Sequence, residues 1–362
     1  LVGHNVTGLI DHVMSGEGLT TAFREMKPGA IDAIYECWAP LRLCLFAEAV
    51  NIYRGDTITL EAMLANEDAL RPGDYPIRLE VIAPDGSKPV VRTVTLTIPE
   101  PDGETEPPFA LPVFSEEVTV DSVPGKYRFV AAFEHGAAAT GGETEFYVTD
   151  AAEMPPVDGE IVLWGEDPAL AEWLETHGIT THPFSASDGG VHEVILVGAA
   201  PPAGDRAVAF EALTARIEQG ATAIFLSPGV FAADGNPTAW LPSAAKGTLG
   251  SLNSWLYLMD TWGKEHPIFD GLPTGGLLDY VYYRELIRDI AFSFEVAPAE
   301  SVAGGIEAAV NYGSGLLISV HEQGAGRLIL NTMLIEEHLG THPAAERLLR
   351  NMLRYGGHED AP

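Results

Sequence analysis

The sequence predicts a multidomain chain in which an all-β unit precedes an α/β unit. With 362 residues, the chain is longer than one ordinary domain. Short alternating apolar runs recur at intervals of about ten residues between 41 and 150. From 158 to 357, apolar runs alternate with amphipathic helical patterns. The remaining segment, residues 1–40, is too short to enclose a core of its own.

This N-terminal segment predicts one strand and at least one helix. Residues 6–10 form an apolar run that predicts the strand. The spacing of Leu19, Ala22, Phe23 and Met26 predicts a helix, which would end at Pro28-Gly29. Such a segment must pack on the next part of the chain or on a protein surface absent from it. Its start, LVGHNVTGLIDH, has no basic region and does not resemble a signal peptide.

The all-β unit, residues 41–150, predicts a sandwich. Its strands are expected at 57–63, 77–82, 90–98, 117–120, 127–133 and 143–148. Turn sequences such as RGD, PGD, PDG and PGK separate them. Six or seven short strands with this punctuation are typical of an immunoglobulin-like sandwich. The acidic loop at 99–108 is expected to be exposed.

The α/β unit comes after a linker at 150–160. Apolar runs in EIVLWGE, VHEVILVG and TAIFL predict buried strands, and PALAEWLETHG and AVAFEALTARIEQG predict helices between them. A strand pair and a closing helix, PAAERLLRNMLRYG, come last. Continuous apolar strands between amphipathic helices indicate a parallel sheet covered on both faces.

The charge of the chain excludes some partners. Fifty-two acidic and 20 basic residues give a formal net charge of -32. This balance excludes a non-specific nucleic-acid binder and disfavours binding to anionic membranes. No apolar run reaches the ~18 residues of a membrane span. The acidic surface is interpreted either as ordinary solvation or as adaptation to high salt.

The cysteines and histidines predict no metal site or cofactor. Cys37 and Cys44 are too few for a disulfide framework and are expected to be buried thiols, which favours the cytoplasm over secretion. The histidines show no metal-ligand spacing. His266 is expected to cap the segment after Pro267. For the acidic loop at 99–108, solvation is favoured over a calcium site.

Polar residues come directly after the first apolar run, in TGLIDHVMSGEG. Asp11, His12 and Glu17 would lie where a strand opens into its loop, the position of active-site residues in (β/α)8 barrels. They could bind a polar ligand. Their alternative role is to cap a helix or brace the loop.

The stretch at 6–34, followed by WAPLRLCLF and a β-sandwich, resembles the end of the catalytic barrel in glycoside hydrolase family 2 and its β-galactosidase-like relatives. The resemblance implies that residues 1–40 are the last strand and helix of a (β/α)8 barrel. It implies that Asp11, His12 and Glu17 line the sugar site. The two catalytic Glu of the family lie on barrel strands that this chain lacks, so no catalytic residue is predicted here.

Two later stretches, HPIFDGLP at 266–273 and the sequence at 324–355, resemble the class I glutamine amidotransferase-like fold. This implies a flavodoxin-like domain at 158–357, similar to the non-catalytic middle domain of some β-galactosidases. Where active relatives carry a nucleophilic Cys, this sequence has Ser227. After His342, Ala344 occupies the position of their acidic residue. We therefore expect a vestigial domain.

An aromatic-rich stretch spans 240–283. Its Trp and Tyr side chains could fill the core, form a protein interface or contact sugar; they are Trp240, Trp255, Tyr257, Trp262, Tyr280, Tyr282 and Tyr283. Alternation predicts that Tyr280 and Tyr282 share one face of a strand.

Together these observations favour the C-terminal portion of a β-galactosidase-like retaining glycoside hydrolase. The parent barrel would bind a β-glycoside, and this chain would serve structural, oligomerisation or substrate-wall roles, in a homo-oligomer or against the missing barrel portion. The alternative is a stand-alone non-catalytic binding or assembly module. A third hypothesis is a hydrolase or transferase that uses Ser227 and a His.

Overall fold

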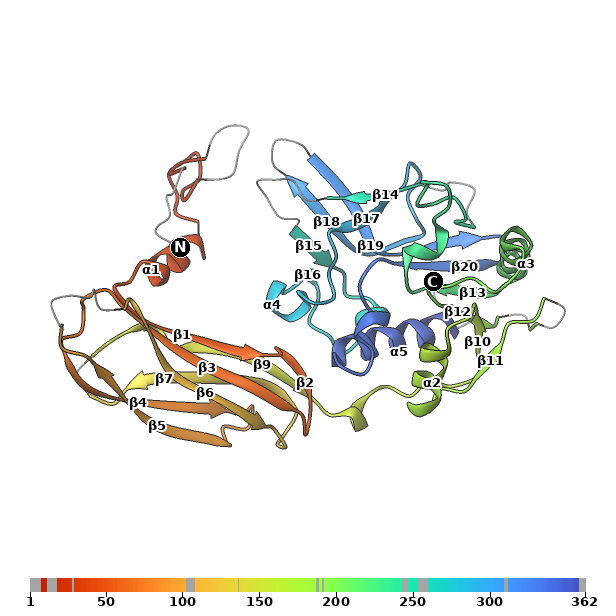
Figure 1. Ribbon diagram of the computed structural model, residues 1–362. Coiled ribbons are helices and arrows are strands. Elements are labelled where there is room, and N and C mark those ends of the chain that lie inside the picture. Colours follow the sequence, from red (N-terminus) through yellow and green to blue (C-terminus); the bar gives the residue numbers. More distant parts are fainter. Residues whose placement is uncertain are drawn as a thin grey trace. The chain divides into compact units, whose positions relative to one another are not determined.

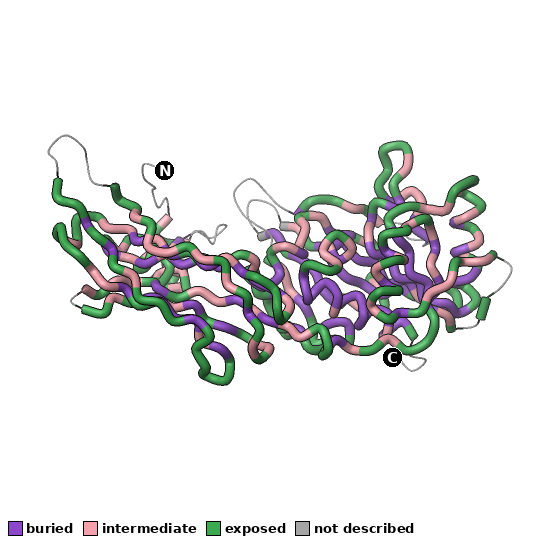
Figure 2. Tube along the Cα trace, turned by 60° about the horizontal axis from the view of Figure 1, so that its bottom comes forward, coloured by how far each residue is buried: buried purple, intermediate pink, exposed green. Residues whose placement is uncertain are grey.

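The computed structural model divides into two units, one ending at Glu153 and one beginning at Met154 (Figure 1). Most of the regular structure is β-sheet, with few helices. Each unit has its own buried core (Figure 2). The structure describes residues 8–11, 18–27, 29–101, 108–135, 137–186, 189–190, 192–242, 247–252, 260–308 and 312–357.

The start of the chain differs from its prediction. The helix predicted over 19–26 is wrong, because Thr20 pairs in isolated bridges with Ile10 and Met26. These pairings use backbone groups that an α-helix would need for its own ladder. The helix of this segment is α1 (Ala30–Cys37) instead.

The two cysteines lie at the end of α1 and on the strand after it. Cys37 is exposed and Cys44 is half-buried, so the prediction of two buried thiols is wrong. The reason is that α1 buries none of its residues, and that Cys44 takes the less buried face of its alternating strand. Both thiols are free.

The rest of the first unit is a two-sheet β-sandwich. One sheet has the strand order β6-β3-β1-β8 and the other β2-β9-β7-β4-β5. All six predicted strands are present. The strands are β1 (Leu41–Glu48), β2 (Asn51–Tyr53), β3 (Thr57–Asn66), β4 (Gly73–Ile82), β5 (Val90–Ile98), β6 (Ala110–Thr119), β7 (Gly125–Phe133), β8 (Thr140–Gly141) and β9 (Glu143–Thr149).

Alternating side chains build the sandwich core. On β3, every second residue from Ile58 to Leu64 is fully buried, as the period of a half-buried strand requires. From the other sheet, Tyr127 and Phe146 stack with ring centroids 5.1 Å apart. The two sheets thus share one apolar interior.

The second unit is built on a sheet whose first five strands are parallel neighbours. In sheet order they are β11 (Thr181–Pro183), β10 (Ile161–Trp164), β12 (Val194–Val197), β13 (Thr222–Phe225) and β20 (Gly326–Asn331). The predicted parallel pairing is confirmed. Antiparallel strands continue the sheet: β19 (Tyr312–Gln323), β18 (Glu300–Ala308), β15 (Asp260–Gly263), β16 (Gly276–Leu277), β14 (Thr248–Ser251) and β17 (Ile290–Ser293).

Helices cover both faces of the parallel strands. On one face, Phe210 and Leu213 of α3 join the core with Val162. On the other, Gly356 of α5 approaches Val194 so closely that a Cβ there would lie 3.4 Å from its side chain. The helices are α2 (Pro168–Thr176), α3 (Arg206–Glu218), α4 (Tyr280–Tyr283) and α5 (Pro343–Gly357), with 3-10 turns η1 (Ala151–Glu153), η2 (Pro228–Phe231), η3 (Pro267–Phe269) and η4 (Glu336–His338).

The strand predicted around Tyr280 is also wrong, because these residues form the helical turn α4. The side chain of Asp279 accepts hydrogen bonds from the backbone N–H groups of Val281 and Tyr282, which caps the turn. Tyr280 is exposed and Tyr282 is buried, so they do not share a face. Within the described residues, no helix is long and apolar enough to cross a membrane.

Candidate functional site

Of the three residues predicted to line a sugar site, Asp11, His12 and Glu17, the structure describes only Asp11. Its Oδ1 lies 2.7 Å from Lys27 Nζ and accepts the backbone N–H of Gly18 at 2.8 Å. These contacts hold the Asp11 side chain against Gly18 and Lys27. His12 and Glu17 lie outside the described residues, as does the start of the strand predicted at 6–10. A sugar-binding role for these residues remains a prediction.

In the α/β unit, a pocket of about 340 Å³ lies where the parallel strands end. Asp167 follows β10, Ala199 follows β12, Ser227 follows β13 and Glu336 follows β20. The chain runs from β10 outward to β11 and then returns to the other side of β10 with β12. Ligands of open α/β sheets bind at such a reversal, outside the carboxyl ends of the strands. We call this site the strand-end pocket.

Asp167 is fixed at the floor of the strand-end pocket by local structure. Its Oδ1 accepts the backbone N–H of Leu170 at 2.9 Å and so caps α2, whose first residue is Pro168. Gly198 lies against it, and a Cβ there would stand 3.2 Å from Asp167 Oδ2. The small residue after β12 therefore leaves room for this carboxylate.

Glu336 faces the same pocket from η4. Burial raises its pKa to about 8, and the neighbouring carboxyl of Asp167 contributes to the rise, while the backbone N–H of Ala199 opposes it. Its buried Oε2 has no hydrogen-bond partner within the described residues. Near neutral pH the carboxyl of Glu336 is therefore held protonated. The protonated group can donate to an acceptor atom of a ligand.

Ser227 lacks the features of an activated nucleophile. Its backbone is extended, with φ -134° and ψ 134°, whereas a nucleophile elbow is a strained turn. Its Oγ accepts the N–H of Gly229 at 3.3 Å. Among the described residues that line the pocket there is no His to serve as its base. The predicted Ser227 thus lies at a strand end without a partner for catalysis.

The buried histidines serve the fold. Burial lowers the pKa of His321 and of His342 to about 4. His321 Nε2 lies 3.0 Å from Ser319 Oγ on the same strand, and His342 Nδ1 accepts the N–H of Ala344 at 3.2 Å. In the described part of the chain, no three His, Cys, Asp or Glu side chains converge as metal ligands.

Sequence reasoning located Ser227 but missed Asp167 and Glu336. A signal for them exists, because both carboxylates come shortly after buried apolar strands of one parallel sheet. The carboxyl ends of such strands meet at a common edge. In the aromatic stretch at 240–283, two side chains belong to the core: Trp240 stacks on Phe210 with ring centroids 5.6 Å apart, and Tyr283 is fully buried. Trp255 and Tyr257 lie outside the described residues.

Comparisons with known proteins return structural likenesses only. The chain is similar to the β-galactosidase from Bacillus circulans sp. alkalophilus, with 10% identity over 56% of this chain and 31% of that chain and a TM-score of 0.31. It is similar to the exo-β-1,4-mannosidase Op5Man5 from Opitutaceae bacterium strain TAV5, with 12% identity over 50% of this chain and 32% of that one and a TM-score of 0.30.

A third likeness covers less of the chain. The CARDB domain of the PF1109 protein from Pyrococcus furiosus matches 31% of this chain and 89% of its own, at 12% identity and a TM-score of 0.22. No protein-family model and no curated protein matches the chain. The chain spans about one third of the length of the galactosidase and mannosidase chains.

Proposed function

We propose that this chain is the C-terminal portion of a β-galactosidase-like glycoside hydrolase and does not itself carry the catalytic Glu pair. Residues 1–40 would complete a (β/α)8 barrel that binds the β-glycoside. Residues 41–150 would form an immunoglobulin-like domain, and residues 158–357 a flavodoxin-like, amidotransferase-like domain. The last two would serve structural, oligomerisation or substrate-wall roles.

One observation carries this proposal: the N-terminal segment exposes its large apolar side chains. Phe23 is 87% exposed, Tyr35 72% and Met26 71%, and α1 buries no residue. Side chains of this size normally contribute about 1.5–3 kcal/mol each when buried. A segment that buries none of them is expected to pack against a further protein surface. The rest of a barrel is such a surface.

The sandwich supports its part of the proposal. Tyr127 lies at the start of β7, and its hydroxyl donates a 2.6 Å hydrogen bond to the backbone carbonyl of Val123, four residues upstream. This arrangement has the geometry of the tyrosine corner of immunoglobulin-like domains. No disulfide is required, since the core is filled by aliphatic and aromatic side chains.

The α/β unit supports a non-catalytic role. Its parallel strand order, β11-β10-β12-β13-β20, corresponds to the 2-1-3-4-5 order of flavodoxin-like folds. Such folds accept many functions, so the site decides the activity. Ser227 replaces the nucleophilic Cys, and its extended backbone and Gly229 contact leave it unactivated.

The test is made in cells that contain the gene. An antibody raised against this chain should detect a polypeptide clearly larger than 38.7 kDa on a denaturing gel. Material captured by the same antibody should hydrolyse a chromogenic β-galactoside or β-glucuronide. A single inactive band near 38.7 kDa would contradict the proposal and favour a stand-alone binding or assembly module.

The purified chain provides the complementary test. It should turn over neither chromogenic substrate. Measurable turnover that a Glu17→Gln substitution abolishes would overturn the absence of a catalytic pair. Unchanged assembly and unchanged stability in a Ser227→Ala variant would agree with a non-catalytic role of the α/β unit.

A further inference from the structure

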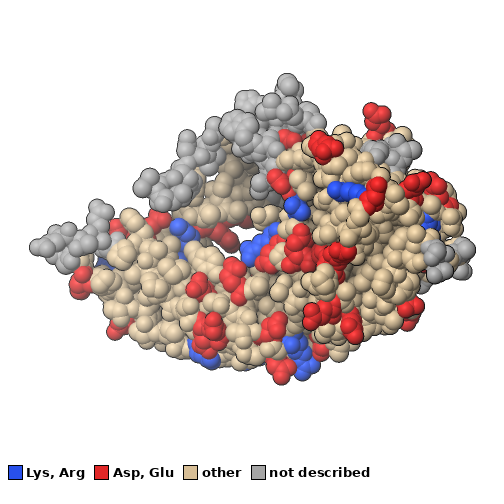
Figure 3. All heavy atoms as spheres, turned by 45° about the vertical axis from the view of Figure 1, so that its right-hand side comes forward, with Lys and Arg blue, Asp and Glu red and all other residues tan. Residues whose placement is uncertain are grey.

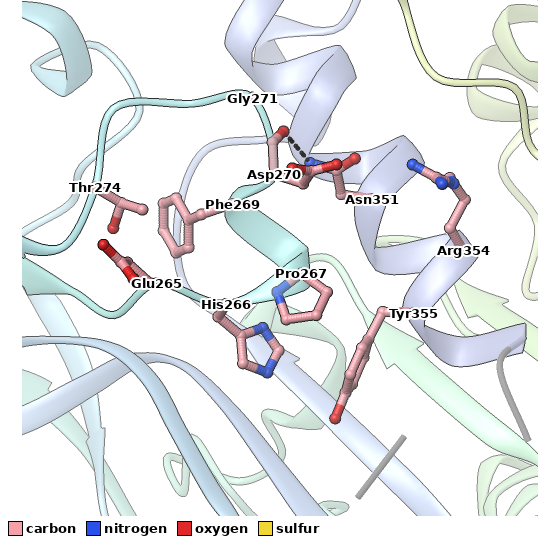
Figure 4. Close-up of a pocket in the computed structure, with 10 residues that line it drawn as sticks. All are labelled: Glu265, His266, Pro267, Phe269, Asp270, Gly271, Thr274, Asn351, Arg354 and Tyr355. Atoms are coloured by element: carbon pink, nitrogen blue, oxygen red, sulfur yellow. Dashed lines mark hydrogen bonds between the residues drawn. The ribbon is translucent and has the colours of Figure 1, made fainter. Parts of the chain in front are cut away.

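A second pocket lies on the α/β unit, apart from the strand-end pocket. Its volume is about 550 Å³, within the ~300–1,000 Å³ of typical small-molecule sites. Residues of the segment 265–274 and of α5 line it (Figure 4). We call it the α5 pocket. Part of the stretch HPIFDGLP, at 266–273, lines it.

Hydrogen bonds fix one wall of the α5 pocket. His266 Nδ1 accepts the backbone N–H of Ile268 at 3.2 Å, which confirms its predicted capping role. Its Nε2 then carries the proton and donates to Glu300 at 2.9 Å. Tyr355 donates its hydroxyl hydrogen to the same carboxylate. This wall is therefore organised before any ligand arrives.

Asn351 ties α5 to the segment that carries His266, and one of its polar atoms has no hydrogen-bond partner in the described part of the chain. Its Nδ2 donates to the carbonyl oxygens of Ile268 at 3.2 Å and Asp270 at 2.9 Å. The side chain is only 2% exposed, and its Oδ1 has no hydrogen-bond partner among the described residues. A buried acceptor without a partner is unfavourable. A donor entering from the pocket, with a small adjustment of the side chain, would relieve this.

Charges of both signs surround the same space. Arg354 is half-buried, while Asp270 and Glu265 are exposed at the rim. Within the described part of the chain, none of these three side chains has a hydrogen bond or ion pair. In Figure 4, Arg354 and Asn351 extend from α5 on one side of Phe269, and Glu265 lies on the other side.

We propose that the α5 pocket binds a neutral saccharide. Asp270 and Glu265 would repel an anion, and Arg354 would repel a cation. Hydroxyl groups suit the whole set, because each can donate to a carboxylate or to an amide oxygen and accept from a guanidinium. The exposed ring of Pro267 supplies apolar surface for the C–H face of a sugar ring. The proposal depends on this pocket alone and not on the proposed parent enzyme.

The experiment measures binding of D-galactose and of lactose to the purified full chain by calorimetry. At least one should bind with a Kd in the millimolar range. Asp270→Asn and Arg354→Met should each weaken binding about tenfold, since each removes a hydrogen bond to a charged group. Glu211→Gln is the matched control, because Glu211 is an exposed carboxylate on α3, which covers the opposite face of the sheet from α5. It should bind like the unmodified chain.

Three results would overturn the proposal. The first is no heat of binding for either sugar with the unmodified chain. The second is equal affinity in Asp270→Asn, Arg354→Met and the control. The third is binding of glycerol as tight as that of the sugars, which would show that no sugar ring is recognised. Circular dichroism of each variant verifies that it is folded.

Discussion

Asn331, the last residue of β20, donates a hydrogen bond from its Nδ2 to the backbone carbonyl of Leu226 at 2.8 Å. Leu226 immediately follows β13 and precedes Ser227. This bond therefore ties two neighbouring strand ends together under the strand-end pocket. Asn331 is 1% exposed, and its side chain also donates to the carbonyl and accepts from the N–H of Met333.

An Asn331→Ala substitution should destabilise the α/β unit by about 3 kcal/mol, because it leaves the buried carbonyl of Leu226 and the N–H of Met333 without a hydrogen-bond partner. Urea unfolding followed by the fluorescence of Trp164, which is buried in the same core, measures the change. Asn66→Ala is the control, since Asn66 makes two similar bonds to backbone N–H groups but at the edge of the sandwich. Equal losses in both variants would contradict the expected importance of burial.

Glu336 should make the α/β unit less stable as the pH rises. In the unfolded chain its carboxyl ionises near its ordinary pKa of 4.5, whereas in the fold burial raises the pKa to about 8. Between these values the folded state binds more protons, so the free energy of unfolding falls with increasing pH. After allowance for solvent screening, we expect a loss of about 2 kcal/mol from this group between pH 5 and 8.

The measurement compares unfolding at pH 5, 6.5 and 8 in the unmodified chain and in Glu336→Gln. The difference between the two should grow with pH in favour of the variant, which cannot ionise. Glu322→Gln, at an exposed carboxyl on β19, is the control for replacing a carboxyl by an amide. A constant difference for Glu336→Gln would show that its carboxyl is not held protonated.

His321 should have the opposite dependence. Burial lowers its pKa from 6.5 to about 4, so below pH 6.5 the unfolded chain takes up a proton that the folded chain refuses. Stability from this group is present above pH 6.5 and is lost as the pH falls toward 4. His321→Gln, which can still bond to Ser319, should flatten this part of the profile. If the same unfolding experiment shows an unchanged loss of stability below pH 6.5 in this variant, His321 does not cause that loss.

The ion pair between Arg216 and Glu193 should depend on both partners. Their closest atoms are 2.6 Å apart, and the side chains are 8% and 11% exposed. Glu193→Ala should cost about 3 kcal/mol, because it leaves a buried guanidinium uncompensated. A double variant, Glu193→Ala with Arg216→Met, should lose less than Glu193→Ala alone. Additive losses in this double-mutant cycle would contradict a coupled pair.

The fold was predictable where side-chain periodicity alone sets the structure. β3 and β7 alternate cleanly, and β10, β12 and β13 are short apolar runs between helices, so pattern and structure agree. Side-chain periodicity gave the wrong element where a single polar contact determines the local structure. Asp279 caps the turn at Tyr280, and Thr20 pairs across a loop, and neither contact has a periodic signature.

The site was predictable only in outline. Ser227 directly follows an apolar run that predicts a strand, so the sequence alone places it at a strand end. The sequence alone also shows that no Cys stands at this position. The approach of Asp167 to Glu336 depends on the order of strands in the sheet, which no local pattern encodes. The raised pKa of Glu336 depends on burial by residues distant in sequence. Asp167 and Glu336 were missed because the order of strands in the sheet, and not the local sequence, brings them together.

The acidic surface predicts that salt stabilises the chain. The formal net charge is -32, and Figure 3 shows carboxylates spread over the visible face with few basic side chains among them. Self-repulsion of this kind opposes the compact state and weakens when the screening length falls from ~10 Å at 0.1 M salt to ~3 Å at 1 M. Raising KCl from about 0.1 to 1 M should therefore raise the Tm by about 5 °C or more.

Sucrose is the control for salt, because it is excluded from the protein surface and favours the compact state without screening charges. At matched osmolarity, sucrose should raise the Tm less than KCl does. KCl should also lose its advantage at about pH 4, where protonation removes much of the negative charge. An equal effect of the two solutes at neutral pH would mean that the acidic surface does not limit stability. A larger effect of KCl would indicate a protein suited to concentrated salt.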